Sequence, residues 1–200
     1  MKMRLAIGAG LTCAFILRAA SGVLCALGPG ASSYNPALDQ RPTSDAVQLA
    51  NRVNAAAKTV CKTTCPTIAL FRNTTAANLM LMAAGDQGKL VYAPQFLGAV
   101  SGSFGDAGVI ALIAHAFGHA LDDSLGAAWI QSGWSAEQRA DAWGGCTLAR
   151  AGLSVSDTQA ALRALEKYPP TPTPNWSVRI PAIRAGYAAC GGDATKLNRK

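Results

Sequence analysis

The chain has 200 residues, of which 50% are hydrophobic and 14% are charged. A chain of this length can bury a substantial core as one domain, and this composition excludes a disordered or fibrous protein. The formal net charge of +7 falls to +4 without Lys2, Arg4 and Arg18, and no basic cluster with interleaved aromatic residues is present. We therefore expect no nucleic-acid partner.

The first residues have the pattern of a secretory signal peptide. A charged start, an apolar stretch and two groups of small residues follow one another at Met1–Arg4, Leu5–Leu17, Ala19–Gly22 and Gly30–Ser32. We assign residues 1–32 to a leader and 33–200 to a single domain that is secreted or periplasmic. An uncleaved N-terminal membrane anchor is the alternative. A lipoprotein attached through Cys25 is disfavoured, because small residues do not directly precede that cysteine.

Four of the six cysteines remain once the leader is removed, and an even number in an exported chain predicts two disulfides. We favour Cys61–Cys65 as a local link and Cys146–Cys190 as a link from a core helix to the C-terminal segment. A metal site made of cysteines is the competing interpretation. Cys61 and Cys65 would supply half of one, but no second pair has similar spacing.

The predicted elements indicate an α+β domain in which helices lie beside a small sheet of about three strands. Apolar residues at three- and four-residue spacing predict a first helix from Thr43. Short β-prone segments between turn residues predict strands at Thr67–Arg72, Leu79–Met82 and Lys89–Tyr92. Four further helices are expected at 107–122, 136–151, 157–168 and 176–190, and a Ser135/Gln138 capping box begins the second of them.

The chain's two histidines, His115 and His119, are four residues apart on the most apolar of these helices. This spacing puts both imidazoles on one helix face, where they can bind one Zn²⁺ at roughly 2.0–2.1 Å. Burying two imidazoles is costly unless their polar atoms have partners, which favours a shared metal ion. The alternative is two unrelated core histidines.

Glu137 and Asp141 have the same four-residue spacing on the next helix. One carboxylate can be the third metal ligand, and the other can accept a hydrogen bond from the second ring nitrogen of a histidine. We assign the first role to Glu137 and the second to Asp141; a solvated helix face is the alternative. Gly144 and Gly145 are expected to let the two helices approach closely.

Three segments resemble M48-type gluzincin zinc metallopeptidases, and the resemblance extends over roughly residues 66–190. Val109–Leu121 is similar to the family's active-site helix, and Glu137–Asp141 is similar to its glutamate helix. Leu79–Leu97 is similar to its edge strand and substrate groove. The resemblance implies a zincin-like fold with Zn²⁺ bound by His115, His119 and Glu137. It also implies an active-site helix beneath the edge of the sheet, so that an extended peptide adds as a strand across the metal.

The implied activity is hydrolysis of peptide bonds by zinc-activated water, with a peptide or protein as the substrate. Arg179 or Tyr187 would assist the oxyanion, although a structural role is equally open for each. The chain departs from the family at Ala116, where the motif glutamate acts as the general base. Loss of such a base lowers the rate by about 10²–10⁴, so we expect metal and peptide binding with little or no turnover.

Two explanations for Ala116 are open. The other expected site residues are intact, which favours a recent or deliberate replacement of glutamate in a metallopeptidase. The alternative is a natural pseudo-peptidase that serves as a secreted zinc- or peptide-binding module. A disulfide-stabilised interaction protein without a metal is a third, less favoured hypothesis.

Overall fold

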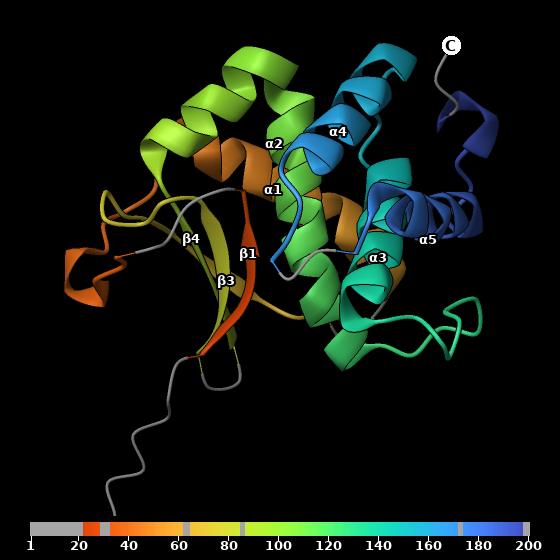
Figure 1. Cartoon of the computed structure of the whole chain (residues 1–200), viewed down its shortest axis with the longest axis horizontal. Helices are drawn as coiled ribbons and strands as arrows, with labels where there is room; N and C mark the ends of the chain where they lie inside the picture. Colours follow the sequence, from red (N-terminus) through yellow and green to blue (C-terminus); the bar gives the residue numbers. More distant parts are fainter. Residues whose placement is uncertain (1–21, 29–32, 62–64, 85–86, 172–173, 198–200) are drawn as a thin grey trace, which may run out of the picture.

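The computed structural model describes residues 22–28, 33–61, 65–84, 87–171 and 174–197. Five α-helices lie beside a four-stranded mixed sheet, as Figure 1 shows, so the expected α+β class is confirmed. The leader expected at 1–32 falls mainly on residues 1–21 and 29–32, which lie outside the described part of the chain.

The sheet has the strand order β1-β3-β4-β2, with β1 antiparallel to β3, β3 antiparallel to β4, and β2 parallel to β4. The strands are β1 (Val23–Leu27), β2 (Ile68–Arg72), β3 (Leu79–Ala84) and β4 (Gln87–Tyr92). The expected count of three strands was wrong, because β1 comes from residues that the sequence assigned to the leader. A leader that ended at residue 32 would therefore take one strand out of the sheet.

Both edges of β1 are hydrogen-bonded. On one side it pairs with β3 in a register that places Cys25 opposite Leu81. On the other side the amide of Thr171 donates to the carbonyl of Ala26 at 3.1 Å, and the amide of Gly28 donates to the carbonyl of Pro169 at 3.3 Å. β1 thus lies between the sheet and the segment that follows α4.

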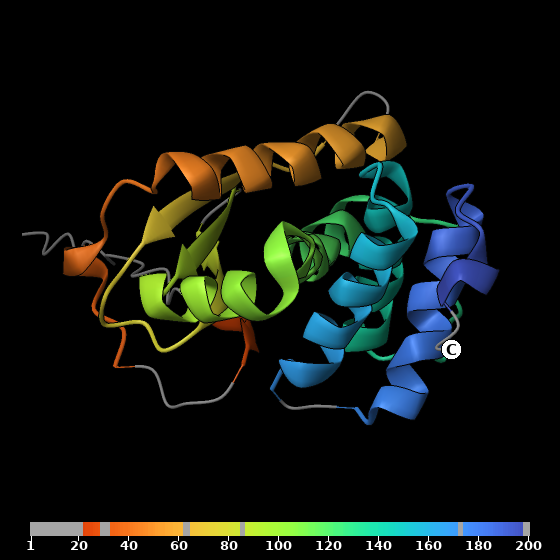
Figure 2. The same cartoon turned by 90° about the horizontal axis from the view of Figure 1, so that it is seen from above.

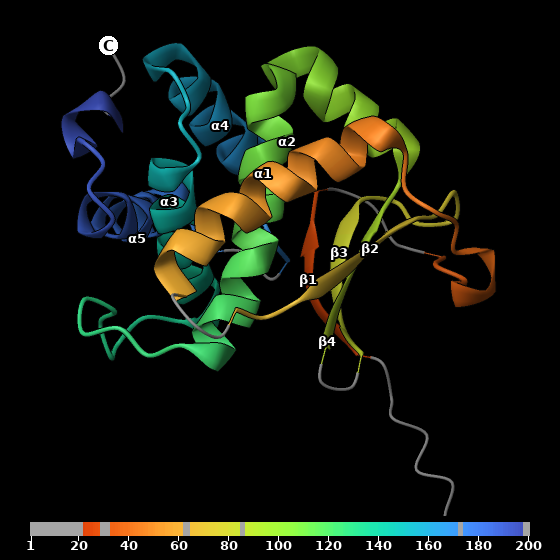
Figure 3. The same cartoon turned by 180° about the vertical axis from the view of Figure 1, so that it is seen from behind.

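The helices are α1 (Ser44–Cys61), α2 (Pro94–Ser124), α3 (Ala136–Arg150), α4 (Val155–Lys167) and α5 (Trp176–Ala189). α2 runs through the centre of the molecule and packs against α1, α3 and α4 (Figure 2). Seen from behind, α1 lies across α2 (Figure 3). The side of α1 that faces the core carries apolar residues at helical spacing, namely Ala46, Leu49, Val53, Ala56 and Ala57.

α2 begins earlier than the sequence predicted. It starts at Pro94, a residue whose fixed φ suits the first turn of a helix, and it changes direction at Gly105, which has a φ of 63°. The expected helix from Ala107 is the part beyond this bend, and every residue from Ala107 to Gly118 is buried. α2 is long and apolar enough to cross a membrane by those two criteria, which core helices also meet.

The ends of the other helices follow from capping. The predicted capping box of Ser135 and Gln138 begins α3. α4 begins at Val155, two residues before the expected start at 157, because the Ser154 hydroxyl caps it by accepting a hydrogen bond from the amide of Asp157. Both predicted disulfides are present: one links the end of α1 to Cys65, and the other joins α3 to the residue after α5.

Candidate metal centre

Four metal-binding side chains meet where β1, α2 and α3 come together. His115 and His119 project from the bent central helix α2, Glu137 comes from the first turn of α3, and Cys25 comes from the middle of β1. One donor atom from each residue lies within 4.8 Å of the donor atoms of all the others. These four residues are called the Cys-His-His-Glu cluster below, and such a cluster could hold a metal ion.

Three of the distances inside the cluster are close to the edges of a tetrahedral metal site. Sγ of Cys25 lies 3.6 Å from Nε2 of His115. Oε2 of Glu137 lies 3.1 Å from Nε2 of His115 and 3.3 Å from Nε2 of His119. Tetrahedral zinc sites with typical zinc–sulfur, zinc–nitrogen and zinc–oxygen bonds separate their ligand atoms by about 3.4–3.6 Å. Only small movements would therefore bring these donors onto one ion.

The second ring nitrogen of His115 is held by a buried ion pair. Nδ1 of His115 lies 2.8 Å from Oδ1 of Asp141. The guanidinium of Arg179 donates to both oxygens of Asp141, from Nε at 2.8 Å and from Nη2 at 2.7 Å. Both Asp141 and Arg179 are 1% exposed. With Nδ1 held by this carboxylate, Nε2 of His115 is the nitrogen that faces the cluster and can bind a metal once the ring is neutral.

The two residues that were proposed to assist an oxyanion lie elsewhere. Arg179 is on α5, and its Nη1 donates to the carbonyl of Leu165 at 2.9 Å while its other nitrogens bind Asp141. Tyr187 lies near the end of α5, where its ring packs against Gly192. Arg179 reaches the cluster only through Asp141, and neither residue belongs to it.

His119 has a buried nitrogen without a hydrogen bond. Its Nε2 is near Glu137, but among the described residues it has no well-aligned hydrogen-bond partner. An unpaired polar atom in the interior costs free energy, and native proteins rarely leave one. A metal ion between the four side chains would satisfy this atom, so the residues present fit such an ion.

The electrostatics of the cluster favour the charged forms of its carboxylate, its thiol and its imidazoles. Burial by itself raises the pKa of Glu137, but its interactions with His115 and His119 lower it to about 2. Burial by itself lowers the pKa of His119, but its interactions with Cys25 and Glu137 raise it to about 9. Burial raises the pKa of the Cys25 thiol, but the two histidines outweigh that effect and the net shift is downward. A lowered thiol pKa is what a metal-binding cysteine requires.

Close helix packing brings the ligands together. A Cβ atom on Gly118 would overlap the carbonyl oxygen of Ala140, so α2 and α3 can be this close only because residue 118 is a glycine. Gly144 faces the backbone of His115 on the same interface, whereas Gly145 faces Ile183 on α5. The sequence-based expectation of close packing at Gly144 therefore holds for α2 and α3, and Gly145 serves a different pair of helices.

Ala116 follows the first histidine and is buried. Its methyl group can neither accept nor donate a proton, so this position contributes no acid–base chemistry.

Cys25 is the site residue that sequence reasoning missed. It was assigned to the leader because the small residues at Gly30–Ser32, after it in the sequence, marked the expected end of the leader. The alternation of exposed Leu24, buried Cys25, part-buried Ala26 and buried Leu27 is that of a strand with one covered face. Gly22 and Gly28 at its two ends were the available sequence signal.

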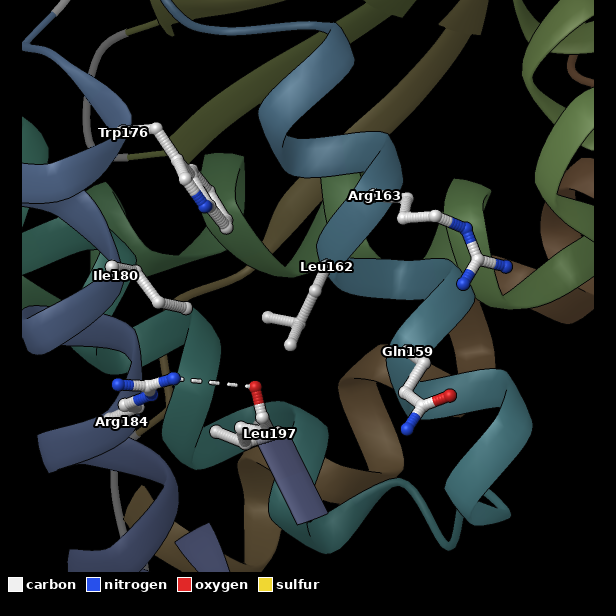
Figure 4. Close-up of a pocket in the computed structure, with 7 residues that line it drawn as sticks. All are labelled: Gln159, Leu162, Arg163, Trp176, Ile180, Arg184 and Leu197. Carbon is white, nitrogen blue, oxygen red and sulfur yellow. Dashed lines mark hydrogen bonds between the residues drawn. The ribbon is translucent and has the colours of Figure 1, made fainter. Parts of the chain in front are cut away.

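A separate cavity of about 410 Å³ lies between α4, α5 and the short 3-10 helix Ala194–Leu197. Figure 4 shows Trp176, Leu162 and Ile180 around it, with Arg163 and Arg184 at its sides. Arg184 donates from Nη2 to the carbonyl of Leu197 at 3.5 Å. None of the residues that line this cavity belongs to the Cys-His-His-Glu cluster.

Comparison with protein-family models, with curated proteins and with solved structures found no match to this chain.

Proposed function

We propose that this protein binds zinc through Cys25, His115, His119 and Glu137 on a gluzincin-like scaffold, and that it does not hydrolyse peptide bonds. The observation that carries the proposal is the buried thiol of Cys25 beside the two histidines, 3.6 Å from Nε2 of His115. A thiolate, two imidazoles and a carboxylate are ligands that Zn²⁺ prefers, and four protein ligands complete its tetrahedron.

The number of ligands separates this function from that of a peptidase. A catalytic zinc site has three protein ligands and keeps one position for the water that attacks the substrate. In the proposed site the thiolate of Cys25 takes that position, and Ala116 offers no base to activate a water. Both differences disfavour hydrolysis of peptide bonds. The pseudo-peptidase hypothesis is therefore favoured over an impaired peptidase.

A four-ligand site would contribute mainly to stability. Zinc bound by buried side chains contributes its binding free energy to folding, because the unfolded chain has no formed site. Here it would join β1 to α2 and α3, the three elements that supply the ligands. A secreted location also remains part of the proposal; the two disulfides fit it, since disulfides persist in oxidising compartments.

The test measures metal content and coordination in the full chain. Purified protein is expected to contain about one zinc per chain by elemental analysis, and removing it should lower the melting temperature. A cobalt-substituted sample should show a thiolate-to-cobalt charge-transfer band that Cys25→Ser abolishes. Protein without a stoichiometric metal, or a band that survives Cys25→Ser, would overturn the proposal.

A second measurement addresses catalysis. Unfolded casein is incubated with wild type, with Ala116→Glu and with Cys25→Ala/Ala116→Glu, each with and without EDTA. Wild type and the single variant are expected to be inactive, because Cys25 still occupies the fourth position. EDTA-sensitive cleavage by Ala116→Glu alone would mean that this position is open, and the four-ligand site would be wrong. The double variant shows whether the assay can detect activity on this scaffold.

A further inference from the structure

The cavity between α4 and α5 shares no residue with the Cys-His-His-Glu cluster. α4 packs on α2, α5 packs on α3, and the short 3-10 helix Ala194–Leu197 contacts both α4 and α5. The cavity of about 410 Å³ is therefore the space left between two helices that pack on different partners. Its size falls in the range of small-molecule binding sites, which is about 300–1,000 Å³.

Apolar side chains form most of the lining. Leu162 from α4 and both Trp176 and Ile180 from α5 point toward the same space in Figure 4, and Leu197 adds a fourth apolar side chain. The two leucines are buried, whereas Trp176 and Ile180 are partly exposed. The guanidinium of Arg179 lies over the ring of Trp176, 5.6 Å from its centroid, and holds the indole at the cavity wall. A ligand can thus enter from solvent and bury apolar surface against a preformed wall.

Arg184 brings a positive charge to this apolar space. It is part-buried on α5, and no carboxylate of the described residues forms an ion pair with it. Its Nη2 donates to the carbonyl of Leu197 at 3.5 Å, which is long for a hydrogen bond, and its buried Nε has no hydrogen-bond partner in the described part of the chain. The guanidinium therefore has unused donors, and a carboxylate is the acceptor that binds two of them side by side.

The α4 side of the cavity adds the amide of Gln159 and the exposed guanidinium of Arg163. The polar groups and the apolar lining together match a molecule that has one anionic end and an apolar body. An inorganic anion would leave the apolar lining uncovered. A neutral apolar molecule would leave the donors of Arg184 without an acceptor.

We propose that this cavity binds a small apolar carboxylate, either an aliphatic or an aromatic acid. The carboxylate pairs with Arg184, and the hydrocarbon body lies against Leu162, Trp176 and Ile180. Arg163 supplies a second positive charge that attracts the anion to the cavity. The proposal uses no residue of the zinc site, so it does not depend on the proposed function.

The test is isothermal titration calorimetry of the full chain with sodium octanoate and with 3-phenylpropionate, one aliphatic and one aromatic member of the class. At least one of them is expected to bind saturably, with one molecule per chain. 1-Octanol has the octanoate chain length without the charge, and it should bind about 10–100-fold more weakly than octanoate, because it lacks hydrogen bonds to a charged group. Inorganic phosphate should not bind saturably at the same concentrations.

Substitution of Arg184 identifies the anion contact. Arg184→Gln keeps a polar side chain but removes the charge, and the affinity for the carboxylate should fall by about 10–100-fold while that for 1-octanol stays the same. Arg52→Gln is the matched control, because it removes one positive charge from an exposed position on α1. Its affinity for the carboxylate should equal that of wild type.

A second variant covers the case in which Arg184→Gln does not fold by circular dichroism. Ile180 lies one helical turn before Arg184, so Ile180→Glu places a competing carboxylate beside the guanidinium and should weaken carboxylate binding at least about tenfold. The proposal is overturned if neither carboxylate binds saturably. It is also overturned if phosphate binds as tightly as the carboxylates, or if a folded Arg184→Gln or Ile180→Glu protein keeps the wild-type affinity.

Discussion

Cys25 and His115 are 90 positions apart in the sequence, yet Sγ of the first lies 3.6 Å from Nε2 of the second in the buried interior. The contact joins the edge strand of the sheet to the central helix at the point where α3 adds Glu137. It changes the expected three-ligand site into one with four donors.

Asp141 is expected to support both the metal and the fold. Asp141→Asn weakens the hydrogen bond that orients His115, and the zinc affinity should fall by about 10–100-fold. It also leaves the buried Arg179 without its charge partner, which should lower the free energy of unfolding by about 3–5 kcal/mol. Chelator competition and urea unfolding measure the two effects.

The matched control for this prediction is Asp122→Asn. Asp122 accepts a hydrogen bond from Arg139 between the same two helices, but that arginine is about one-third exposed. Loss of this ion pair should lower the free energy of unfolding by no more than about 1 kcal/mol and leave the zinc affinity unchanged. Similar losses of affinity in both variants would refute the role given to Asp141.

Zinc binding at neutral pH is expected to release protons. The pKa of about 9 for His119 means that this imidazole is protonated at pH 7 in metal-free protein, while a metal binds only the neutral ring. The pKa of His115 is also raised: burial lowers it, but the charge and hydrogen bond of Asp141 outweigh burial. The apparent affinity should therefore rise with pH, by about tenfold per unit for each proton released.

Calorimetric titrations in buffers with different ionisation enthalpies would count these protons. His119→Ala should release fewer protons than wild type at the same pH. A titration at pH 7 in which the heat does not depend on the buffer would contradict the prediction.

Gly118 is expected to set the distance between α2 and α3. In Gly118→Ala the new methyl group would meet the carbonyl oxygen of Ala140, so the helices must separate. We expect a loss of about 1–3 kcal/mol in the free energy of unfolding, together with weaker zinc binding. Gly102→Ala is the control, because Gly102 lies in the same helix with open space around it. At position 102 alanine should stabilise the helix by up to about 1 kcal/mol. Equal effects of the two substitutions on stability and zinc binding would contradict the role given to Gly118.

The two disulfides are expected to differ in their contribution to stability. Cys146 and Cys190 are separated by 44 residues, and Cys61 and Cys65 by four. The entropy of closing the two loops in the unfolded chain predicts a cost of about 4 kcal/mol for removing the first and about 2 kcal/mol for removing the second. Paired Cys→Ala variants compared by chemical unfolding test the order, and a larger cost for the short loop would contradict the entropic account.

The sequence by itself determined the features that depend on local spacing. Helix periodicity and capping residues predicted all five helices, although α2 begins earlier than expected, and Ser135 with Gln138 identified the start of α3. The cysteine count predicted two disulfides, and the favoured pairing is the one that the structure contains. The spacing of His115 and His119, and of Glu137 and Asp141, predicted which face of each helix the site would use, because residues four apart lie one turn apart on the same side.

Only the tertiary structure decided which distant segments join those faces. The glycines at the two ends of a five-residue apolar strand are a weak local signal that does not separate it from a leader, so β1 and Cys25 became visible only through pairing with β3. Arg179 likewise acquired its partner, Asp141, only when α5 packed on α3. Such contacts depend on loop closure and on shape complementarity over the whole chain, neither of which is contained in the spacing of neighbouring residues.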